Sequence, residues 1–382
     1  MEIHIHCLII LVLLFLGYYI YKLYRFKKLA FMENNLRSAD FKSGDKVSII
    51  ACARNEEDNL PSLLEALLNQ EYDLTDIEII IVNDQSTDKT EDILKEYSNK
   101  YNFIKYINIT NRDYVISPKK NALSHAIEMA DGEILLLTDA DCVPSKDWIS
   151  SHVSIYNKHP ETDMIVGFAK IAQAQCLKLS QVFEYIDFLI LMFAAQGAIQ
   201  AGHPYSCSGQ NLSYKKSCFQ GINGFEDIDH FISGDDLMLM QKFVKYGKII
   251  RFAAFSDAYT ETKPAKNWKA FINQRARWAS NLKAMLKMNF SFFFYLFTCF
   301  LCIGIMPLLI IPYIIKCFFD ISFINHSLKI WDIEYVKKMR SNSFLGLNLN
   351  YIIIWFLISP FYVLVVTVRG IFSLFKWKDR RG

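Results

Sequence analysis

The chain has 382 residues, of which 52% are hydrophobic, and its formal net charge is only +3. This length accommodates one large domain together with membrane segments. The hydrophobic residues are concentrated in separate blocks, which is typical of membrane-spanning segments. The small net charge gives no support for nucleic-acid binding, so we expect no nucleic-acid partner. Cys52 and Cys142 lie in segments that we place in the cytoplasm, where thiols stay reduced.

The first hydrophobic block, residues 3–21, contains no Asp, Glu, Lys or Arg. A helix of this length just crosses the hydrocarbon core, which needs about 20 residues. A cleaved signal peptide would start with basic residues and end at a small-residue cleavage site, and this segment has neither. We therefore predict a transmembrane anchor at 1–24 and a polar linker at 25–45. Basic residues after the block place the following domain in the cytoplasm. They are Lys22, Arg25, Lys27 and Lys28.

Strand-like and helix-like segments alternate within residues 46–251, the predicted catalytic domain. The strand-like runs are 47–52, 77–82 and 133–138, and the helix-like runs are 60–68, 90–97 and 121–130. This alternation predicts an α/β fold with a mostly parallel sheet and helices on both faces. In such sheets ligands bind beyond the carboxyl ends of the strands. The residues that follow the strands are therefore the first candidates for a binding site.

Several polar residues after the first two strands could bind a nucleotide. Asp84 follows the second strand, and its carboxylate could accept hydrogen bonds from a base or a ribose. Capping of the next helix explains Asp84 equally well. Arg54 and Glu56 follow the first strand and could face the same nucleotide. Lys119 and Lys120 begin a helix and one of them, for which we take Lys119, could contact a phosphate, although a solvated basic helix start is equally plausible.

Asp139 and Asp141 flank a single alanine at the end of the third apolar strand. Two carboxylates this close repel each other, and a strand end does not need them for stability. Mg²⁺ and Mn²⁺ prefer oxygen ligands, so this pair is a candidate metal site for either ion. Such a metal would neutralise the charge on a leaving diphosphate. The alternative is an ordinary polar turn.

Asp235 and Asp236 lie between a glycine and an apolar helix-like segment. The helix dipole favours negative charge at this position, so capping is one explanation. The functional alternative is a general base, which would take the proton from an acceptor hydroxyl as that hydroxyl attacks a sugar.

Residues 252–289 are predicted to form amphipathic interface helices. Gln274 and Arg277 are three residues apart, which places them on one helix face. Arginine binds diphosphate oxygens bidentately, and the neighbouring Trp278 offers a stacking face for a sugar. A basic helix at a membrane surface is a compatible alternative.

Two further uncharged runs, 292–315 and 341–368, predict a transmembrane region at 290–370 with about two spans. The basic tail, 371–382, is predicted to be cytoplasmic, which requires an even number of crossings. Lysines and an arginine between the two runs fit an external loop poorly. Pro307 and Pro312 could break the first run into a hairpin, so the number of crossings stays open.

Taken in order, these motifs resemble the membrane-bound inverting glycosyltransferases of family 2, which have a GT-A fold. The resemblance covers residues 47–278. The matching segments are Ala53-Arg54-Asn55-Glu56-Glu57, Val82-Asn83-Asp84-Gln85-Ser86-Thr87-Asp88, Thr138-Asp139-Ala140-Asp141, Gly209-Gln210-Asn211-Leu212-Ser213-Tyr214-Lys215, Gly234-Asp235-Asp236 and Gln274-x-x-Arg277-Trp278.

The resemblance implies a role for each segment. It assigns the nucleoside to Arg54, Glu56 and Asp84, the metal and diphosphate to Asp139 and Asp141, and the catalytic base to Asp236, beside Asp235. It places Gln274, Arg277 and Trp278 close to the donor diphosphate and the acceptor. It also makes 209–215, followed by Gly224 and Phe225, the acceptor-side segment. The chain departs from the family pattern in having Asn83 for a common aspartate, Gln85 for a common glycine, and Ile-Ser-Gly before Asp235.

The expected activity is transfer of a hexose from a nucleotide-sugar, by the resemblance a UDP-sugar, to the hydroxyl of a lipid or lipid-linked glycan. We expect the enzyme in the plasma (inner) membrane, with its catalytic domain facing the cytoplasm and a role in cell-envelope glycan or glycolipid synthesis. A processive polysaccharide synthase is the first alternative. A non-catalytic scaffold would have no need to keep four aspartates together, namely Asp84, Asp139, Asp141 and Asp236. A nucleotidyltransferase would not explain the Gln-x-x-Arg-Trp motif.

Overall fold

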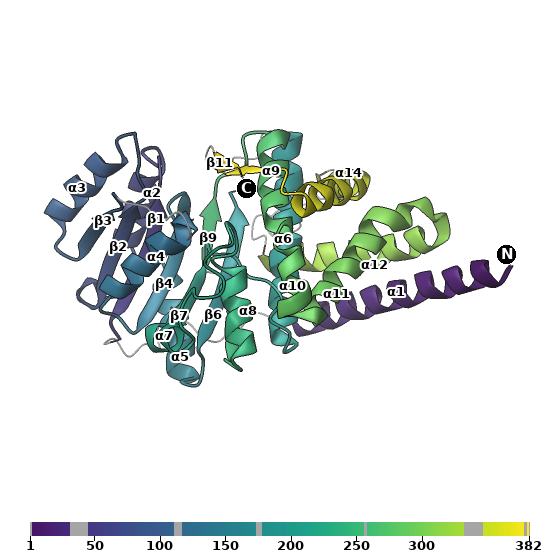
Figure 1. Cartoon of the computed structure of the whole chain (residues 1–382), viewed down its shortest axis with the longest axis horizontal. Helices are drawn as coiled ribbons and strands as arrows, with labels where there is room; N and C mark the ends of the chain where they lie inside the picture. The colour runs from purple at the N-terminus through teal and green to yellow at the C-terminus, as the bar shows by residue number, and fades with distance from the viewer. Residues whose placement is uncertain are drawn as a thin grey trace. The chain divides into compact units, whose positions relative to one another are not determined.

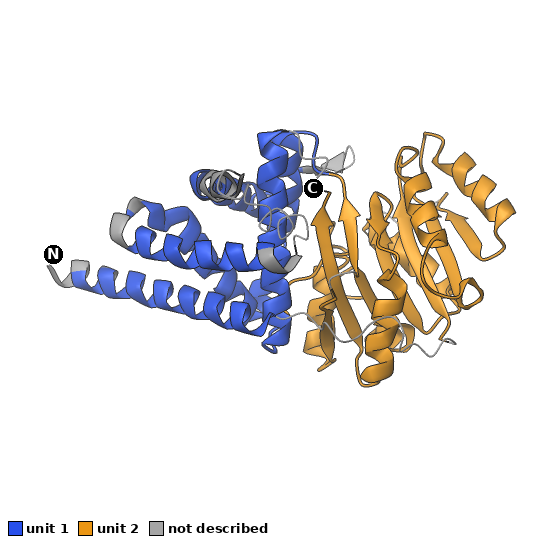
Figure 2. Ribbon diagram, turned by 180° about the vertical axis from the view of Figure 1, so that it is seen from behind, with its two compact units in different colours: residues 1–31, 173–203, 264–382 blue, residues 32–172, 204–263 orange. Residues whose placement is uncertain are grey.

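The computed structural model describes residues 2–30, 45–110, 117–172, 178–255, 258–331, 347–377 and 380–381. The chain divides into two compact units (Figure 2). The sheet unit comprises residues 32–172 and 204–263, and the helical unit comprises 1–31, 173–203 and 264–382. The range predicted as the catalytic domain, 46–251, therefore includes a segment, 173–203, that belongs to the helical unit.

The described residues of the sheet unit contain one nine-stranded sheet in the order β3-β2-β1-β4-β7-β6-β9-β5, with β8 also paired to β6 (Figure 1). The strands are β1 Val47–Ala53, β2 Ile77–Asn83, β3 Ile104–Asn108, β4 Ile134–Asp139, β5 Cys142–Pro144, β6 Met164–Ile171, β7 Leu212–Lys215, β8 Ile250–Ala253 and β9 Tyr259–Thr262.

The three predicted strands correspond to β1, β2 and β4, and they are parallel as expected. The second half of the sheet is mixed. β7 runs antiparallel to both β4 and β6, and β5 runs antiparallel to β9. β5, β7 and β9 have only three or four residues each and lack the long apolar run that identifies a buried strand, so the sequence pattern did not indicate them.

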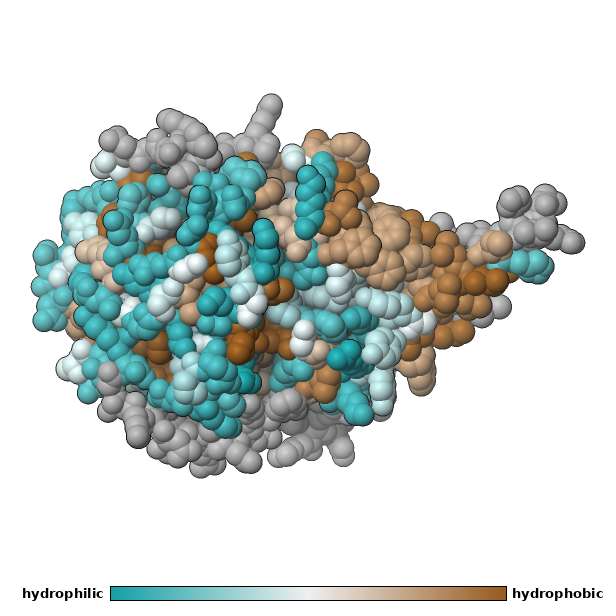
Figure 3. Space-filling model, turned by 60° about the horizontal axis from the view of Figure 1, so that its bottom comes forward, coloured by the Kyte–Doolittle hydropathy of each residue, from teal (hydrophilic) through white to brown (hydrophobic). Residues whose placement is uncertain are grey.

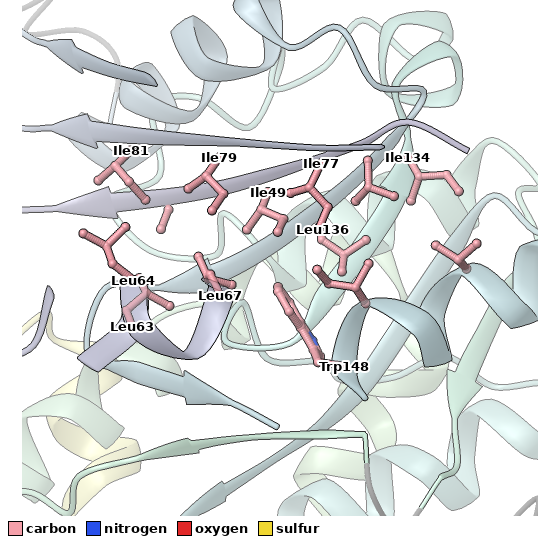
Figure 4. Packing of buried hydrophobic residues seen from close by; sticks show 14 of the residues in the cluster. Ile49, Leu63, Leu64, Leu67, Ile77, Ile79, Ile81, Ile134, Leu136 and Trp148 are labelled. Atoms are coloured by element: carbon pink, nitrogen blue, oxygen red, sulfur yellow. The ribbon is translucent and has the colours of Figure 1, made fainter. Parts of the chain in front are cut away.

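Helices of the sheet unit bury both faces of the parallel strands. The helices are α2 Leu60–Leu68, α3 Thr90–Lys100, α4 Pro118–Met129, α5 Trp148–Lys158, α7 Lys216–Gly221 and α8 Leu237–Lys245. Every residue of β2 is buried. Leu64 and Leu67 of α2 face Ile49 and Ile79, with Trp148 beside them (Figure 4). Alternate strand residues point to the opposite face, and α4 contacts β1 and β2.

The helical unit contains seven α-helices in the described residues: α1 Glu2–Leu29, α6 Leu179–Gln200, α9 Trp268–Ala279, α10 Leu282–Met288, α11 Phe290–Cys299, α12 Ile310–Trp331 and α14 Leu347–Ile371. A π-helical turn, Phe300–Ile305, and a 3₁₀ turn, Met306–Leu308, separate α11 from α12. α1 contacts α6 at Gly197, where an added Cβ would lie 2.6 Å from the carbonyl oxygen of Phe26. Only glycine permits this approach.

Two helices of the described residues are long and apolar enough to cross a membrane, Ile9–Leu29 and Leu179–Gln200. The first corresponds to the predicted anchor and exposes many apolar side chains. Figure 3 shows that apolar residues gather on part of the surface, whereas hydrophilic residues cover most of the rest of this face. The second is α6, which sequence analysis did not predict as a span. It is 78% buried, as in the core helix of a helical protein.

The two predicted C-terminal spans are not confirmed. The run 292–315 is interrupted around Pro307, and its apolar helix extends only over Phe290–Ile305. The second run gives the shorter apolar helix Trp355–Ile371. Most of the predicted linker, residues 31–44, and the segment between the runs, residues 332–346, lie outside the described residues.

Candidate active site

The sheet places three of the predicted site segments at one edge. β1 lies between β2 and β4, with Ala53 opposite Asn83 and Cys52 opposite Asp139. Arg54 follows β1, Asp84 follows β2, and Asp139 ends β4. Because the three strands are parallel, their carboxyl ends meet at this edge, where ligands bind in open α/β sheets.

Arg54 and Asp84, which were predicted to contact a nucleoside, form a pair at this edge. A guanidinium nitrogen of Arg54 lies 3.9 Å from Asp84 Oδ2, and Asp84 is buried. Hydrogen bonds from main-chain N–H groups to side-chain oxygens join the two loops: Asn55 N donates to Ser86 Oγ at 3.0 Å, and Thr87 N donates to Asn55 Oδ1 at 2.8 Å. These hydrogen bonds hold the loops that carry Arg54 and Asp84 against each other.

Glu56 has local partners at the start of α2. Its Oε2 accepts a hydrogen bond from Asn59 Nδ2 at 2.7 Å, and its main-chain N donates to Thr90 Oγ1 at 2.9 Å. These bonds organise the turn between β1 and α2, so a structural role accounts for this residue as well as the predicted nucleoside contact does.

The two departures from the family pattern near Asp84 have local explanations. Asn83 Nδ2 donates to Asn108 Oδ1 at 2.8 Å, and Asn83 Oδ1 accepts from Ser86 N at 3.1 Å. The Asn83 amide thus holds the loop itself. Gln85 has φ of 56°, a left-handed conformation that glycine adopts without strain. The glycine that is common in the family would suit this backbone.

Lys119 connects the two acidic clusters. Its Nζ lies 2.7 Å from Asp139 Oδ1 and 2.8 Å from Asp235 Oδ2. Burial lowers the pKa of Lys119, but the charges of Asp139 and Asp235 outweigh it and raise that pKa well above its usual value. Lys119 was predicted to contact phosphate. Here its ammonium group brings the end of β4 and the start of α8 together.

Asp139 and Asp141 fit a hard divalent cation. Together with Cys142 they bring three potential ligand atoms within 4.8 Å of one another. Burial raises the pKa of the Cys142 thiol well above its usual value, so the sulfur stays protonated and donates to Asp141 Oδ1 at 3.7 Å. The oxygens are therefore the suitable ligands, and oxygen is what Mg²⁺ and Mn²⁺ prefer.

Asp236 is held by two main-chain N–H groups. Its Oδ1 accepts from Leu237 N at 2.6 Å, and its Oδ2 accepts from Gly209 N at 2.7 Å. Burial of the carboxylate raises the pKa of Asp236, and the charge of Asp235 raises it further. The capping alternative is correct, since Asp236 is the N-cap of α8. The cap and a raised pKa occur in the same side chain, so capping does not exclude proton transfer.

The segment before β7 supports Asp236, which sequence analysis did not anticipate. Thr138 Oγ1 donates to Gln210 O at 2.9 Å. Asn211 is fully buried, and its Oδ1 accepts from Trp148 Nε1 at 2.8 Å and lies 2.9 Å from His152 Nε2. Burial lowers the pKa of His152 to about 4. The run Gly-Gln-Asn was the only sequence signal for this support.

Gln274, Arg277 and Trp278 lie on α9 of the helical unit, whereas the acidic residues lie in the sheet unit. Arg275 organises this motif: its Nε donates to Asp187 Oδ2 at 3.1 Å, and one of its terminal nitrogens donates to Gln274 Oε1 at 3.1 Å. Its guanidinium carbon lies 4.1 Å from the centre of the Trp278 ring. It stays a prediction that the Gln-x-x-Arg-Trp motif and the acidic residues of the sheet unit form one site.

Comparison with known families identifies the class of protein. Residues 48–217 match the family described as Glycosyl transferase family 2, and residues 134–368, more than half of the chain, match Glycosyl transferase family group 2. The chain belongs to the family 2 glycosyltransferases. It is therefore a glycosyltransferase enzyme, as the order of the acidic motifs predicted.

Individual relatives support this assignment. The chain is 30% identical over 250 residues to Probable glycosyltransferase YdaM of Bacillus subtilis, a match that covers 65% of this chain and 58% of that protein. It is 25% identical over 268 residues to the poly-β-1,6-N-acetyl-D-glucosamine synthase of Staphylococcus epidermidis, covering 69% of this chain and 61% of that synthase. The match thus spans about three fifths of the length of these relatives.

A solved structure establishes the fold. The mannosyltransferase PcManGT from Pyrobaculum calidifontis, in complex with GDP-Man and Mn²⁺, superposes with a TM-score of 0.59 at 15% identity. The superposition covers 95% of this chain and 96% of the mannosyltransferase. The mixed α/β arrangement of this family 2 enzyme is therefore GT-A-like.

Proposed function

We propose that this enzyme transfers a hexose from a nucleotide-sugar to the hydroxyl of a lipid or lipid-linked glycan by a single inverting displacement. The observation that carries the proposal is the arrangement around Lys119. This residue links the candidate metal acid Asp139 to the candidate base pair Asp235–Asp236. Donor activation and proton removal would then take place within one acidic site.

Donor binding would use the edge of the parallel strands. Asp84 and Arg54 offer an acceptor and a donor group for a nucleoside, on loops that are already fixed to each other. Asp139 and Asp141 would hold Mg²⁺ or Mn²⁺, which when bound supplies positive charge for the leaving diphosphate. A UDP-sugar is the first donor to test, on the family resemblance. The mannosyltransferase with the same fold was solved with GDP-Man, so guanosine donors belong in the panel.

Asp236 is better suited to act as the base than Asp235. The ammonium group of Lys119 lies 2.8 Å from Asp235 Oδ2, so Lys119 competes with an acceptor hydroxyl for that carboxylate. Burial and the charge of Asp235 raise the pKa of Asp236, which favours its use as a proton acceptor. The N–H groups of Gly209 and Leu237 would keep its oxygens in place while a hydroxyl proton is transferred.

The helical unit would bring this chemistry to a membrane surface. α1 exposes Ile9, Ile10 and Leu14 over half of their surface or nearly so, as a lipid-facing helix does. Gln274, Arg277 and Trp278 would serve the diphosphate and the acceptor. We place the enzyme in the plasma (inner) membrane with the sheet unit on the cytoplasmic side, following the basic residues after the anchor.

Processive polysaccharide synthesis is the second candidate, because one relative is named as a poly-β-1,6-N-acetyl-D-glucosamine synthase. The two activities differ in product size. A single transfer gives an acceptor with one added sugar, whereas a processive enzyme gives long chains while most acceptor remains unmodified.

The deciding experiment is release of nucleotide by the detergent-purified chain from a panel of nucleotide-sugars, with Mn²⁺ or Mg²⁺ and lipid acceptor extract. We expect metal-dependent release from one donor and its loss in Asp141→Asn. If the wild-type chain neither releases nucleotide nor binds any donor in the presence of metal, the proposal is wrong.

A further inference from the structure

The first turn of α4 holds the loop that precedes the proposed base. This loop, residues 229–233, is here called the pre-base loop. Ser117, immediately before α4, donates from its main-chain N to Asp229 O at 2.8 Å and from its hydroxyl to Ile232 O at 3.3 Å. Lys120 Nζ donates to Phe231 O and, at 3.2 Å, to Ser233 O. Four carbonyls of one short loop are thus bonded to one helix start.

Lys120 is an unusual residue for this position because its side chain is fully buried. A buried ammonium group costs free energy unless its N–H groups are hydrogen-bonded. Burial lowers the pKa of Lys120 to about 8, with the charges of Asp235, Asp236 and Asp229 acting in the opposite direction. At neutral pH Lys120 therefore remains mostly protonated and keeps its three donors.

The pre-base loop leads directly into the catalytic acids. Ser233 is followed by Gly234, whose φ of 84° is left-handed, and then by Asp235 and Asp236. A shift of the Ser233 carbonyl would therefore move both carboxylates. Positioning errors of about 1 Å at a reacting group can cost about 100-fold in rate.

Lys119 and Lys120 have different partners although they are adjacent. Successive helix residues project about 100° apart, so one side chain can enter the acidic site while the next points to the neighbouring loop. Lys119 pairs with the Asp139 and Asp235 carboxylates, and Lys120 bonds main-chain carbonyls. α4 thus contacts both the side chains and the backbone of the base segment.

We propose that Lys120 is a positioning residue that fixes the Asp235–Asp236 pair through the backbone of the pre-base loop. The inference rests on the proposed role of Asp236 as base. It assigns to Lys120 no contact with donor, metal or acceptor.

The test compares two buried lysines in the full-length protein. Lys120→Met retains an apolar stem of similar length but removes the donors. The matched control is Lys242→Met, because Lys242 is also buried and donates to the carbonyls of Asn223, Gly224 and Glu226, on a different loop. The readouts are kcat for nucleotide release from the donor that the wild-type enzyme uses, and the Kd for UDP with Mn²⁺.

We expect kcat of Lys120→Met to fall about 10- to 100-fold, while its Kd for UDP with Mn²⁺ stays within about twofold of wild type. Lys242→Met should lose comparable thermal stability but keep kcat within about threefold. A kcat of Lys120→Met within about twofold of wild type, or no lower than that of Lys242→Met, overturns the inference. Both outcomes presuppose an active wild-type enzyme, so they leave the proposed function intact.

A second readout does not depend on activity. Hydrogen exchange of the Gly209 and Leu237 amides reports their bonds to Asp236, and both amides should exchange at least about tenfold faster in Lys120→Met. Unchanged exchange overturns the inference. If Lys120→Met does not fold, Lys120→Gln replaces it, since its shorter side chain retains a donor but cannot reach both carbonyls. A kcat within twofold of wild type for Lys120→Gln would then overturn the inference.

Discussion

Replacing Asp236 by asparagine removes the proposed base with little change in shape. Asp236 accepts hydrogen bonds on both oxygens, from Leu237 N and Gly209 N. An asparagine has one oxygen, so its NH₂ group would face one of these two N–H donors. One donor left unpaired in this way costs about 1–3 kcal/mol of folding free energy. Loss of general-base catalysis costs about 10²- to 10⁴-fold in kcat.

The assay is steady-state transfer at saturating donor, with donor Kd measured separately. We expect kcat of Asp236→Asn to fall by at least about 100-fold while donor Kd changes little. The base must be deprotonated to work, so wild-type kcat falls as the pH drops through the pKa of Asp236. Because that pKa is raised, this acid limb should lie above the usual range of an aspartate, and it should vanish in the variant.

Asp235→Asn is the matched control, because it also removes one carboxylate and in addition breaks a salt bridge to Lys119. We expect a smaller loss of kcat than in Asp236→Asn. The assignment of the base is refuted if Asp236→Asn keeps more than about a tenth of the wild-type kcat, or if Asp235→Asn is the more damaging change.

Three further predictions concern the metal site, the buried histidine and the Gln-x-x-Arg-Trp helix. Asp141→Asn should weaken Mn²⁺ affinity in calorimetry by at least about tenfold, as loss of even an outer-shell partner does; unchanged affinity would remove Asp141 from the metal site. Burial lowers the pKa of His152 in the folded chain to about 4, against 6.5 for the free side chain. The unfolded chain therefore takes up this proton first, so the contribution of His152 to folding stability is complete above about pH 6.5 and is lost as the pH falls towards 4. The difference in pKa corresponds to about 3 kcal/mol. Urea unfolding should show this fall in the free energy of unfolding at acid pH for wild type but not for His152→Gln, and an equal dependence on pH in the two proteins would contradict the prediction. Arg275→Met should destabilise the chain by about 3–5 kcal/mol because the buried Asp187 loses its ion pair and keeps only the hydrogen bond from the Tyr362 hydroxyl. The double variant Arg275→Met/Asp187→Leu should recover most of that loss in thermal unfolding, and a double variant as unstable as Arg275→Met would argue against a dominant ion pair.

The sequence predicted the strand ends well because β1, β2 and β4 are continuous apolar runs followed by polar residues. Their order in the sheet then brings Arg54, Asp84 and Asp139 to one edge without further information. The mixed half of the sheet was not predictable in this way. β7 has only four residues, and its neighbours β4 and β6 are distant in the sequence.

Side-chain partners were harder to predict than element positions. Lys119 looked like a phosphate ligand because it is a basic residue at a helix start, but its contacts with Asp139 and Asp235 depend on two segments 20 and 116 positions further along the chain. Asp236 could be recognised as a cap or as a base, and nothing in the local pattern indicates that Gly209 supplies its second N–H donor.

The position of α6 in the sequence, between two segments of the sheet unit, has a consequence for synthesis of the enzyme. The chain passes from the sheet unit to the helical unit at residue 173 and returns at 204. The ribosome therefore completes Asp139 and Asp141 before α6, and Gly209, Asp235 and Asp236 only after it. A nascent chain that has reached α6 carries the candidate metal ligands but not the proposed base. We expect the enzyme to become competent only once α6 has been placed among the other helices of its unit, so activity would be coupled to correct assembly of the helical unit.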